Sequence, residues 1–319
     1  MRYILFIFAI ILLSISMGCL GFLTGGDDLR VSILGKYGSA EGELNRPCGI
    51  DYAITLAIAD KGNHRVALFR EGGGGWYFLR NIGRFGYDDS LLNGPIDVAL
   101  DIRSMDSENT SQGNIYILNS DGKISRFTLG GKYILSWGNQ GTNDYDTWKP
   151  RALACDAFNN IYITDVLNNS VQKFDSMGTL LTSWGRPGNG SSEFDGPTGI
   201  GIDKKLSEPG EIVGVTDSGN NRIILFGLDG QYLNEIDLEG VYHILPITGY
   251  SRSENRNGII NNEYCGFVGI KDNGEVYYDK IYCNDGSRRL LTPSGIDIGG
   301  LSIVIVADSS LHVVKFYYF

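Results

Sequence analysis

Three histidines are the side chains in this sequence best suited to metal binding or proton transfer: His64, His243 and His312. Imidazole titrates near neutral pH and is the commonest nitrogen ligand of metals in proteins. These positions are far apart in the chain, so they can act together only if the fold brings them to one place. The sequence has no nucleophile elbow, phosphate-binding loop or EF-hand loop, which leaves the histidines as the main catalytic candidates.

The sequence also contains five cysteines, four of which follow the N-terminal segment. Cys265 and Cys283 flank a predicted hairpin whose Asn273-Gly274 turn would bring them nearly opposite each other, so we predict a disulfide between them. Cys48 and Cys155 fall in repeats that are not neighbours, and we expect both to be buried free thiols. A disulfide requires an oxidising compartment, and the N-terminus indicates one.

The first 28 residues have the features of an export and tethering segment. Arg2 precedes an apolar run over 4–15, which has about the length of the hydrophobic region of a secretory signal. Ser16-Met17-Gly18-Cys19 follows and resembles a lipobox, where a chain is cleaved before the cysteine and lipidated on it. We predict a signal segment over 1–18, a lipid anchor on Cys19 and a tether over 19–28. The alternative is an uncleaved anchor that ends at residue 23. Both place the rest of the chain outside the cell, attached to the cell membrane.

The remaining residues, 29–319, contain a phrase of fixed internal spacing that occurs four times. A glycine is followed by a second glycine three positions later and by a proline twelve positions after the first. The copies start at Gly35, Gly83, Gly138 and Gly185 and end at Pro47, Pro95, Pro150 and Pro197. Each proline opens an apolar strand, a second strand ends in Asp, a third ends in Phe, and a fourth closes the unit. Such a repeat of four short strands is typical of propeller blades.

The spacing of the prolines predicts six blades. The four prolines are 48, 55 and 47 residues apart, and Pro293 follows after 96, twice the repeat, which indicates a fifth blade near Pro246. The unit that starts at Pro293 has only three strands, and residues 29–35 (LRVSILG) have the pattern of the missing fourth. We therefore predict an all-β, six-bladed β-propeller of four-stranded antiparallel blades over 29–319, with the ring closed by the N-terminal strand joining the C-terminal blade.

The turn after the second strand of most blades carries all or part of an Asp-x-x-Asn-x-Arg motif. An Asp at a strand end can accept hydrogen bonds from the next backbone amides, Asn tolerates left-handed turns, and Arg can lie back over the Asp. We therefore assign a structural role to the motif residues, which are Asp60, Asn63, Arg65, Asp165, Asn168, Asp217, Asn220, Arg222 and Asp308. Blade two departs from the motif with a short hairpin turn, Asn119-Ser120-Asp121-Gly122.

Residues 60–69 (DKGNHRVALF) and 217–226 (DSGNNRIILF) resemble the NHL repeat, a family of six-bladed propellers. The resemblance covers about residues 29–319 and is weakest in blades two and five. Among similar enzymes, peptidyl-hydroxyglycine amidating lyases hold zinc with three histidines beside a Tyr and an Arg. By that resemblance His64, His243 and His312 are zinc candidates on one rim. Similar lactonases hold a divalent ion with Glu, Asn and Asp, but no spacing here singles out such a set.

The composition narrows the class of partner. A net charge of −10 repels the phosphate backbone, so we expect no nucleic-acid binding. Polar insertions at 104–112 in blade two and at 251–263, between the first two strands of blade five, are candidate recognition loops. We expect a binding or scaffold module for protein, peptide or glycan, with no bound cofactor, rather than an enzyme. A metal-dependent lyase or lactonase with zinc or calcium at the channel mouth, and a purely structural surface protein, remain the alternatives.

Overall fold

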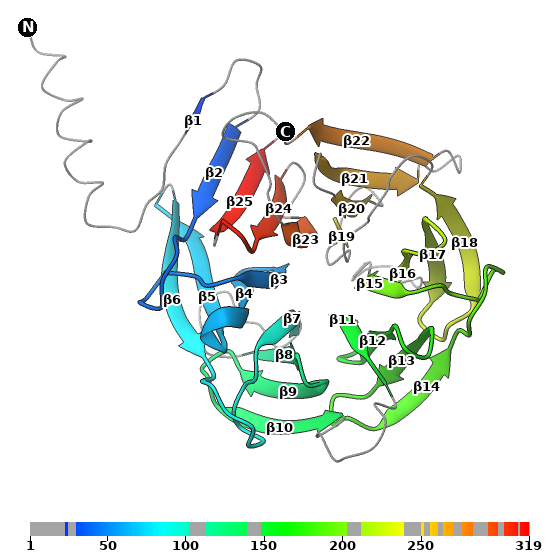
Figure 1. Cartoon of the computed structure of the whole chain (residues 1–319), viewed down its shortest axis with the longest axis horizontal. Coiled ribbons are helices and arrows are strands. Elements are labelled where there is room, and N and C mark those ends of the chain that lie inside the picture. Colours follow the sequence, from blue (N-terminus) through cyan, green and yellow to red (C-terminus); the bar gives the residue numbers. More distant parts are fainter. Residues whose placement is uncertain are drawn as a thin grey trace, which may run out of the picture.

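The computed structural model of the chain describes residues 23–24, 30–73, 75–101, 113–138, 148–202, 212–238, 250–251, 256–260, 264–270, 276–282, 293–298, 303–311 and 313–318. Within these ranges the strands form six antiparallel sheets arranged around a central axis (Figure 1). The predicted all-β, six-bladed propeller is therefore confirmed.

The blades are numbered along the chain, and each is given from its inner to its outer strand. Blade 1 comprises β3 (Pro47–Tyr52), β4 (Leu56–Asp60), β5 (Arg65–Gly72) and β6 (Gly75–Ile82). Blade 2 comprises β7 (Pro95–Asp101), β8 (Asn114–Asn119), β9 (Lys123–Thr128) and β10 (Tyr133–Gly138). Blade 3 comprises β11 (Pro150–Cys155), β12 (Ile161–Asp165), β13 (Ser170–Phe174) and β14 (Leu180–Trp184). Blade 4 comprises β15 (Pro197–Ile202), β16 (Ile212–Asp217), β17 (Arg222–Gly227) and β18 (Tyr232–Asp237).

Blade 5 is continuous in sequence, whereas blade 6 combines strands from the two ends of the chain. Blade 5 comprises β19 (Tyr250–Ser251), β20 (Arg256–Ile260), β21 (Tyr264–Ile270) and β22 (Val276–Tyr282). Blade 6 comprises β23 (Pro293–Ile298), β24 (Ile303–Asp308), β25 (Val313–Tyr318) and β2 (Arg30–Leu34), and β1 (Leu23–Thr24) is added outside β2. The described residues include no helix of the length and apolar character that a membrane span requires. The predicted signal segment and Cys19 lie outside the described residues, as does the tether apart from β1.

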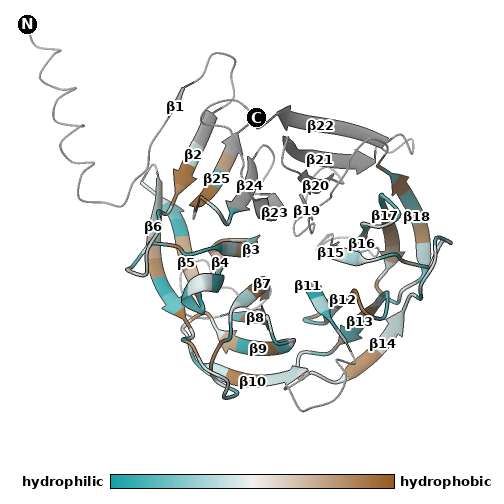
Figure 2. Cartoon of the chain, in the orientation of Figure 1, coloured by the Kyte–Doolittle hydropathy of each residue, from teal (hydrophilic) through white to brown (hydrophobic). Residues whose placement is uncertain are grey.

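The core lies between neighbouring blades, because the middle strands are apolar on both faces. β4 and β12 are buried at every position. Leu68 of blade 1 packs in one cluster with Leu100 and Ile115 of blade 2, so the contact joins two sheets. Hydrophobic stretches, drawn in brown, occur on strands all round the described part of the ring (Figure 2). This sheet-to-sheet packing fixes the positions of the loops at both ends of the strands.

The ring is closed by strands from opposite ends of the sequence. β2 pairs antiparallel with β25, and Ser32 lies opposite Phe316. The Phe316 ring stacks on Trp76 of β6, with 4.8 Å between the ring centroids. Blade 6 is thus completed by the N-terminal strand, as predicted, and is packed directly against blade 1.

The prediction that 251–263 forms an insertion between the first two strands of blade 5 is wrong. Arg256–Ile260 within it is strand β20, the second strand of the blade, and it pairs with β21 so that Ile260 lies opposite Cys265. Backbone pairing with β21 does not require apolar side chains. A segment that begins with polar residues can therefore form a strand, although its sequence lacks the apolar pattern of one. Pro246 and the 104–112 segment lie outside the described residues.

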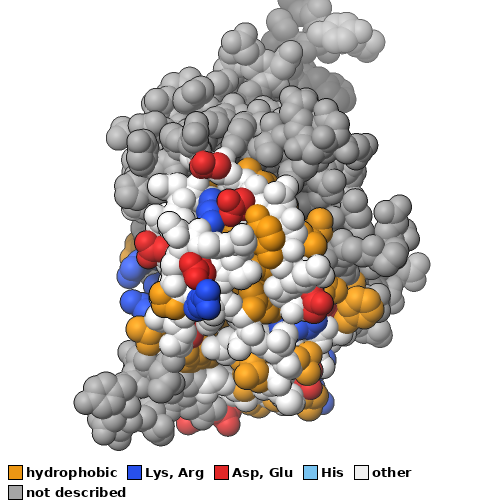
Figure 3. Space-filling model, turned by 90° about the vertical axis from the view of Figure 1, so that its right-hand side faces the viewer, with side chains coloured by type: hydrophobic (Ala, Val, Ile, Leu, Met, Phe, Trp, Pro, Cys, Tyr) orange, Lys and Arg blue, Asp and Glu red, His pale blue; other side chains and the backbone are white. Residues whose placement is uncertain are grey.

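A β-bulge recurs in the outer strands of blades 1 to 4. The pairing skips one aliphatic residue in each: Leu79, Ile134, Leu181 and Leu233. The last three are 37, 51 and 47% exposed. Bulges twist an edge strand and interrupt its ladder, which hinders pairing with another chain. The side of the ring that carries β14 and β18 shows apolar side chains between charged ones (Figure 3).

Candidate functional site

The Asp of the turn motif joins its own blade to the loop that precedes the blade. In blade 1 the buried Asp60 accepts a hydrogen bond of 2.6 Å from the backbone N–H of Asn45, and others from Asn63 Nδ2 at 2.7 Å and Arg65 Nε at 2.8 Å. Burial raises the pKa of the Asp60 carboxyl, and these hydrogen bonds oppose the rise. The backbone amide that donates to Asp60 thus belongs to Asn45, before β3. The sequence had suggested an amide that follows Asp60.

Arg65 extends this connection to the backbone of the preceding glycine-containing loop. Its guanidinium donates to the carbonyl oxygens of Ser39, Ala40 and Glu43 at 2.8, 3.0 and 2.9 Å. Asn63 Nδ2 also donates to Gly38 O, at 2.8 Å. The motif therefore fixes the shape of the loop before β3, because several backbone carbonyls share one charged donor.

Blade 4 repeats this arrangement. Asp217 accepts from the backbone N–H of Asp195 at 2.7 Å, from Asn220 Nδ2 at 2.7 Å and from Arg222 Nε at 3.0 Å. Arg222 in turn donates to the carbonyl oxygens of Gly190 and Glu193, at 2.8 and 3.0 Å.

Blade 2 makes the same connection with different residues, which the sequence motif did not reveal. Asn119 Oδ1 accepts from the backbone N–H of Asn93 at 3.0 Å, in the place of an Asp. Lys123 Nζ donates to the carbonyl oxygens of Asp88 and Leu91 at 2.7 and 2.9 Å, in the place of an Arg. Their positions in the sequence could have indicated them, because Asn119 ends the second strand of the blade and Lys123 begins the third.

Blades 3 and 6 retain only part of the motif. Asp165 Oδ1 accepts from the backbone N–H groups of Lys149 and Leu167 at 2.9 and 3.0 Å, and Asn168 Nδ2 donates to Asp165 Oδ2 at 2.5 Å. Asp308 Oδ1 accepts from the backbone of Ser310 and Leu311, both at 3.2 Å. In these blades the Asp does accept from the amides that follow it.

His64 takes part in the contact between blades 1 and 2. Its backbone is left-handed, with φ of 54°, and its Nδ1 accepts a hydrogen bond of 2.9 Å from the backbone N–H of Gly94. His243 and His312 lie outside the described residues, so the predicted convergence of three histidines stays a prediction. The residues that the structure does describe contain no group of three or more His, Cys, Asp or Glu side chains that could hold a metal ion.

Beside His64 lies a cluster of exposed aromatic rings. The centroid of the Phe85 ring is 4.4 Å from that of His64 and 5.6 Å from that of Tyr87, and both pairs meet edge to face. Phe85 and Tyr87 are 54 and 74% exposed, and Tyr37 in the corresponding loop before β3 is 67% exposed. We refer to His64, Phe85 and Tyr87 as the aromatic surface. Exposed aromatic rings of this kind are typical of binding surfaces, and no sequence motif marks these positions.

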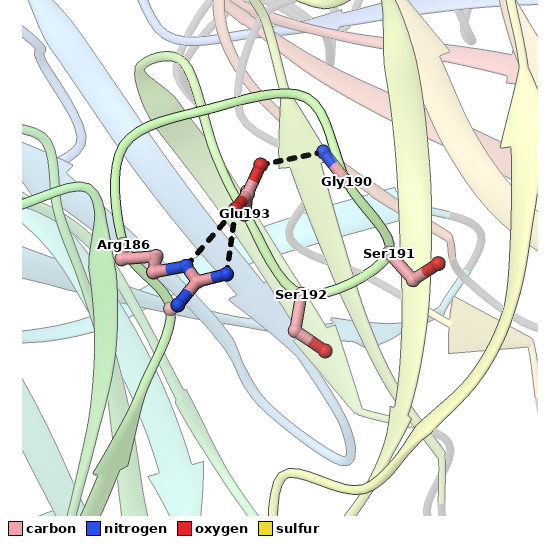
Figure 4. Close-up of a pocket in the computed structure, with 6 residues that line it drawn as sticks. Arg186, Gly190, Ser191, Ser192 and Glu193 are labelled. Carbon is pink, nitrogen blue, oxygen red and sulfur yellow. Dashed lines mark hydrogen bonds and ion pairs between the residues drawn. The ribbon is translucent and has the colours of Figure 1, made fainter.

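A shallow pocket of about 330 Å³ lies in the loop before β15, lined by Gly185, Arg186, Gly190, Ser191, Ser192 and Glu193 (Figure 4). Arg186 contacts Glu193 Oε1 through Nε and through a terminal nitrogen, both at 2.9 Å, and Glu193 Oε2 accepts from Gly190 N–H at 2.9 Å. The side chains of Ser191 and Ser192 point away from this ion pair (Figure 4). The charged groups of the pocket thus hold the loop together.

Two carboxylates of the inner strands connect blade 1 to blade 2 and blade 2 to blade 3. Asp51 of β3 accepts a hydrogen bond of 2.6 Å from the backbone N–H of Leu100 in β7, and Asp97 of β7 accepts one of 2.9 Å from Leu153 in β11. Burial raises the pKa of Asp97 to about 7, and its hydrogen bonds and the charge of Arg151 oppose the rise. A Cβ on Gly49 would lie 2.6 Å from the Cα of Asp97, so the close approach of β3 and β7 requires glycine there.

Of the cysteines, Cys155 is buried, Cys48 is half-buried, and neither forms a disulfide. β21 and β22 form the hairpin expected around the Asn-Gly turn, with Cys265 opposite Ile281. Cys283 lies outside the described residues, so the predicted disulfide is neither confirmed nor contradicted.

Comparison with known proteins supports the same fold. A sequence family described as a 6-bladed beta-propeller matches residues 149–265. The sequence has no match among curated proteins. The structure is similar to virginiamycin B lyase from Staphylococcus aureus, with a TM-score of 0.54 and 13% identity over 92% of this chain and 100% of the lyase. It is also similar to a nidogen chain in a nidogen/laminin complex, with a TM-score of 0.57 and 15% identity over 84% of this chain and 97% of the other. The identities are low, so these likenesses concern the fold: the chain is a six-bladed β-propeller.

Proposed function

We propose that the chain is an exported, membrane-anchored propeller of NHL type that acts as a binding or scaffold module for a protein, peptide or glycan. The observation that carries the proposal is the aromatic surface, where Phe85 and Tyr87 present large exposed rings at 54 and 74% exposure. Rings held in place by a rigid loop can contact a partner with little loss of side-chain entropy. The hydrogen bonds of Lys123 to the loop backbone supply that rigidity.

The likeness to nidogen, whose solved structure is a complex with laminin, supports a protein partner for this chain. The fold alone does not select a ligand, because propellers serve binding and catalysis alike. The turn motifs of blades 1 and 4 support the NHL type, since the same Asp, Asn and Arg recur with the same contacts.

The experiment compares binding by the full chain in detergent on arrays of surface proteins, peptides and glycans. Wild type is tested beside a Phe85→Ser, Tyr87→Ser double variant and a Phe158→Ser control. Phe158 is 61% exposed and lies in the turn between β11 and β12, at the opposite end of the strands from the aromatic surface. We expect the double variant to lose binding to the array ligands and the control to keep it. Equal binding by all three proteins would show that the aromatic surface is not the binding surface.

The anchor is tested separately. Metabolic labelling with a fatty acid, for wild type and a Cys19→Ala variant, distinguishes a lipid anchor from an uncleaved apolar segment. Protease added to intact cells reports whether the propeller faces outside. Metal analysis of the purified chain tests the expectation that no zinc or calcium is bound; a stoichiometric zinc lost on substitution of His64 would support a lyase instead.

A further inference from the structure

Two exposed apolar side chains lie at the tips of two turns at the same end of blade 3. Phe158 is in the turn between β11 and β12, and Met177 is in the turn between β13 and β14. Their exposed fractions are 61 and 64%. β11 and β13 both run away from the loop that leads into the blade, so both turns lie at the opposite end of the strands from that loop. We refer to Phe158 and Met177 as the apolar tips.

An aspartate at the start of each turn holds the backbone of the tip. Asp156 Oδ1 accepts hydrogen bonds from the backbone N–H groups two and four residues later, at 2.7 and 2.8 Å. Asp175 Oδ1 accepts the corresponding pair at 2.9 and 2.8 Å. These amides are therefore satisfied within their own turns, and the tips can contact an apolar phase without losing those hydrogen bonds.

The turn that carries Met177 does not need an apolar residue at its apex. It is closed by a hydrogen bond of 2.9 Å from the backbone N–H of Asp175 to Thr179 O. In blade 4 the backbone N–H of Gly227 closes the corresponding turn, with a bond of 2.8 Å to the residue four positions later. Asp229 takes the place of Met177 in that turn. Because the same turn forms with a charged apex, the fold does not explain the exposed methionine.

The N-terminal strand enters the ring at the same end as the apolar tips. β2 runs towards the loop that precedes β3, so its first residue, Arg30, lies at that end of the strands. Thr24 lies opposite Arg30, and Leu23 lies opposite Val31. Cys19 is four residues before Leu23, which limits its distance from β1 to about 14 Å. An uncleaved anchor would end at Leu23 itself, so either form of the proposed anchor would attach the bilayer close to this end of blade 6.

Blade 3 and blade 6 lie across the ring from each other (Figure 1). The anchor at blade 6 and the apolar tips of blade 3 are therefore at opposite sides of one face of the propeller. A bilayer that meets both lies along this face. Contact through the anchor alone would leave the ring free to tilt.

We propose that this face rests on the lipid bilayer in which the N-terminus is anchored, with Phe158 and Met177 inserted at the level of the headgroups and upper acyl chains. Transfer of exposed apolar area from water into this layer is favourable. The chain has a net charge of −10 and gains no general attraction to anionic lipids, so the contact is an apolar one. The inference rests on the anchor of the proposed function and adds the orientation of the ring, in which the aromatic surface points away from the bilayer.

Photo-crosslinking in vesicles tests this contact. The full chain is incorporated from detergent into phosphatidylcholine vesicles, with benzoylphenylalanine in place of Phe158, of Met177 or, as the control, of Leu167. Leu167 is 49% exposed and belongs to the same blade, but it lies in the turn between β12 and β13, at the other end of the strands. We expect mass spectrometry of the peptides to find lipid adducts at the two tips and none at the control position. Equal yields at the three positions, or no lipid adduct at either tip, would overturn the proposal.

Flotation of the same vesicles separates this contact from the anchor. A chain that floats without lipid adducts at the tips would keep the anchor and refute the resting face. A chain that does not float would refute the anchor, and the resting face with it. Adducts at the tips between two copies of the chain, in place of lipid adducts, would identify a contact between copies and would also overturn the proposal.

A Met177→Asp variant separates the contact from folding. Because Asp229 occupies the same place in blade 4, we expect this variant to unfold at the same urea concentration as wild type. With benzoylphenylalanine in place of Phe158, it should still float but lose most of the lipid adduct, since a charge at the neighbouring tip opposes insertion. A Leu167→Asp variant is the matched control and should keep the adduct. A stable Met177→Asp variant with an unchanged adduct yield would contradict the role given to this tip.

Discussion

The ammonium group of Lys123 lies 2.7 Å from the carbonyl oxygen of Asp88, and through this contact the third strand of blade 2 holds the loop that leads into the same blade. Arg65 makes the corresponding contact to Ala40 at 3.0 Å in blade 1. The two blades thus use different cations for one purpose, the fixing of a loop that carries exposed side chains. Phe85 and Tyr87 belong to the loop that Lys123 holds, so the aromatic surface depends on it.

Replacement of Lys123 by Ala should therefore loosen this loop. Two carbonyl oxygens would lose a charged donor, and we expect a loss of stability of about 1–3 kcal/mol. A Lys123→Arg variant, which restores the residue type of blades 1 and 4, should stay within about 1 kcal/mol of wild type. Urea denaturation measures both, and cleavage by chymotrypsin at Phe85 and Tyr87 reports the loop directly. Equal cleavage rates in Lys123→Ala and wild type would exclude this role.

Replacement of Arg222 by Ala should be more damaging. The Arg222 side chain is 10% exposed and its partner Asp217 is fully buried, so the variant leaves a buried charge without its cation. We expect a loss of about 3–5 kcal/mol in the free energy of unfolding. Arg186→Ala is the matched control, because Arg186 also pairs with a carboxylate but its side chain is 78% exposed. The control should change stability by less than about 1 kcal/mol; similar losses in the two variants would contradict the assignment.

Asp97 should make stability depend on pH. Its pKa is raised from an ordinary 3.8 to about 7 by burial, with a smaller contribution from Asp51 in the same direction and an opposing one from Arg151. Between these two values the folded state holds a proton that the unfolded state has lost, so this group destabilises the fold as pH rises through the window. The full effect is about 4 kcal/mol.

An Asp97→Asn variant can still accept the hydrogen bond from Leu153 and has no charge. The free energy of unfolding, measured by urea denaturation from pH 4 to pH 8, should fall less for this variant than for wild type, by up to about 4 kcal/mol. Parallel curves for the two proteins would show that the Asp97 carboxyl does not titrate in this range.

The bulged residues of the outer strands should tolerate charge. Leu181 and Leu233 are about half exposed and lie outside the regular pairing of their strands. A Leu181→Lys, Leu233→Lys variant should keep its stability within about 1 kcal/mol and associate less at high concentration, because lysine on an edge strand opposes pairing between chains. Light scattering and urea denaturation test this; marked unfolding would mean that the two residues contribute to packing.

Most of the fold could be predicted because the turns between its strands need backbone conformations that favour glycine. Gly35, Gly83, Gly138 and Gly185 all have φ between 79 and 97°, so the repeating phrase marks turns that favour glycine. The strand β20 was missed because pairing with β21 uses backbone groups and leaves no apolar pattern. The closure of blade 6 was predictable because the unit that starts at Pro293 has only three strands, and residues 29–35 have the pattern of a fourth strand.

The inter-blade contacts and the aromatic surface could not be predicted from the sequence in the same way. Asp97 acts on the backbone of the next blade, at a contact that no local spacing encodes. Phe85 and Tyr87 are aromatic residues in a loop, and only the packing of the loop decides whether such residues are exposed. Sequence patterns describe each blade, whereas these features belong to the contacts between blades.

The pairing of β2 with β25 also sets the order in which the molecule can be completed. Arg30 lies opposite Tyr318, so β2 cannot join blade 6 until β25 has been synthesised. A ribosome that has made five blades has produced a curved, unfinished arc with an exposed blade face at each end. Premature termination anywhere before β25 therefore leaves β2 without its partner, and such chains should be recognised by chaperones or proteases rather than accumulate as smaller propellers.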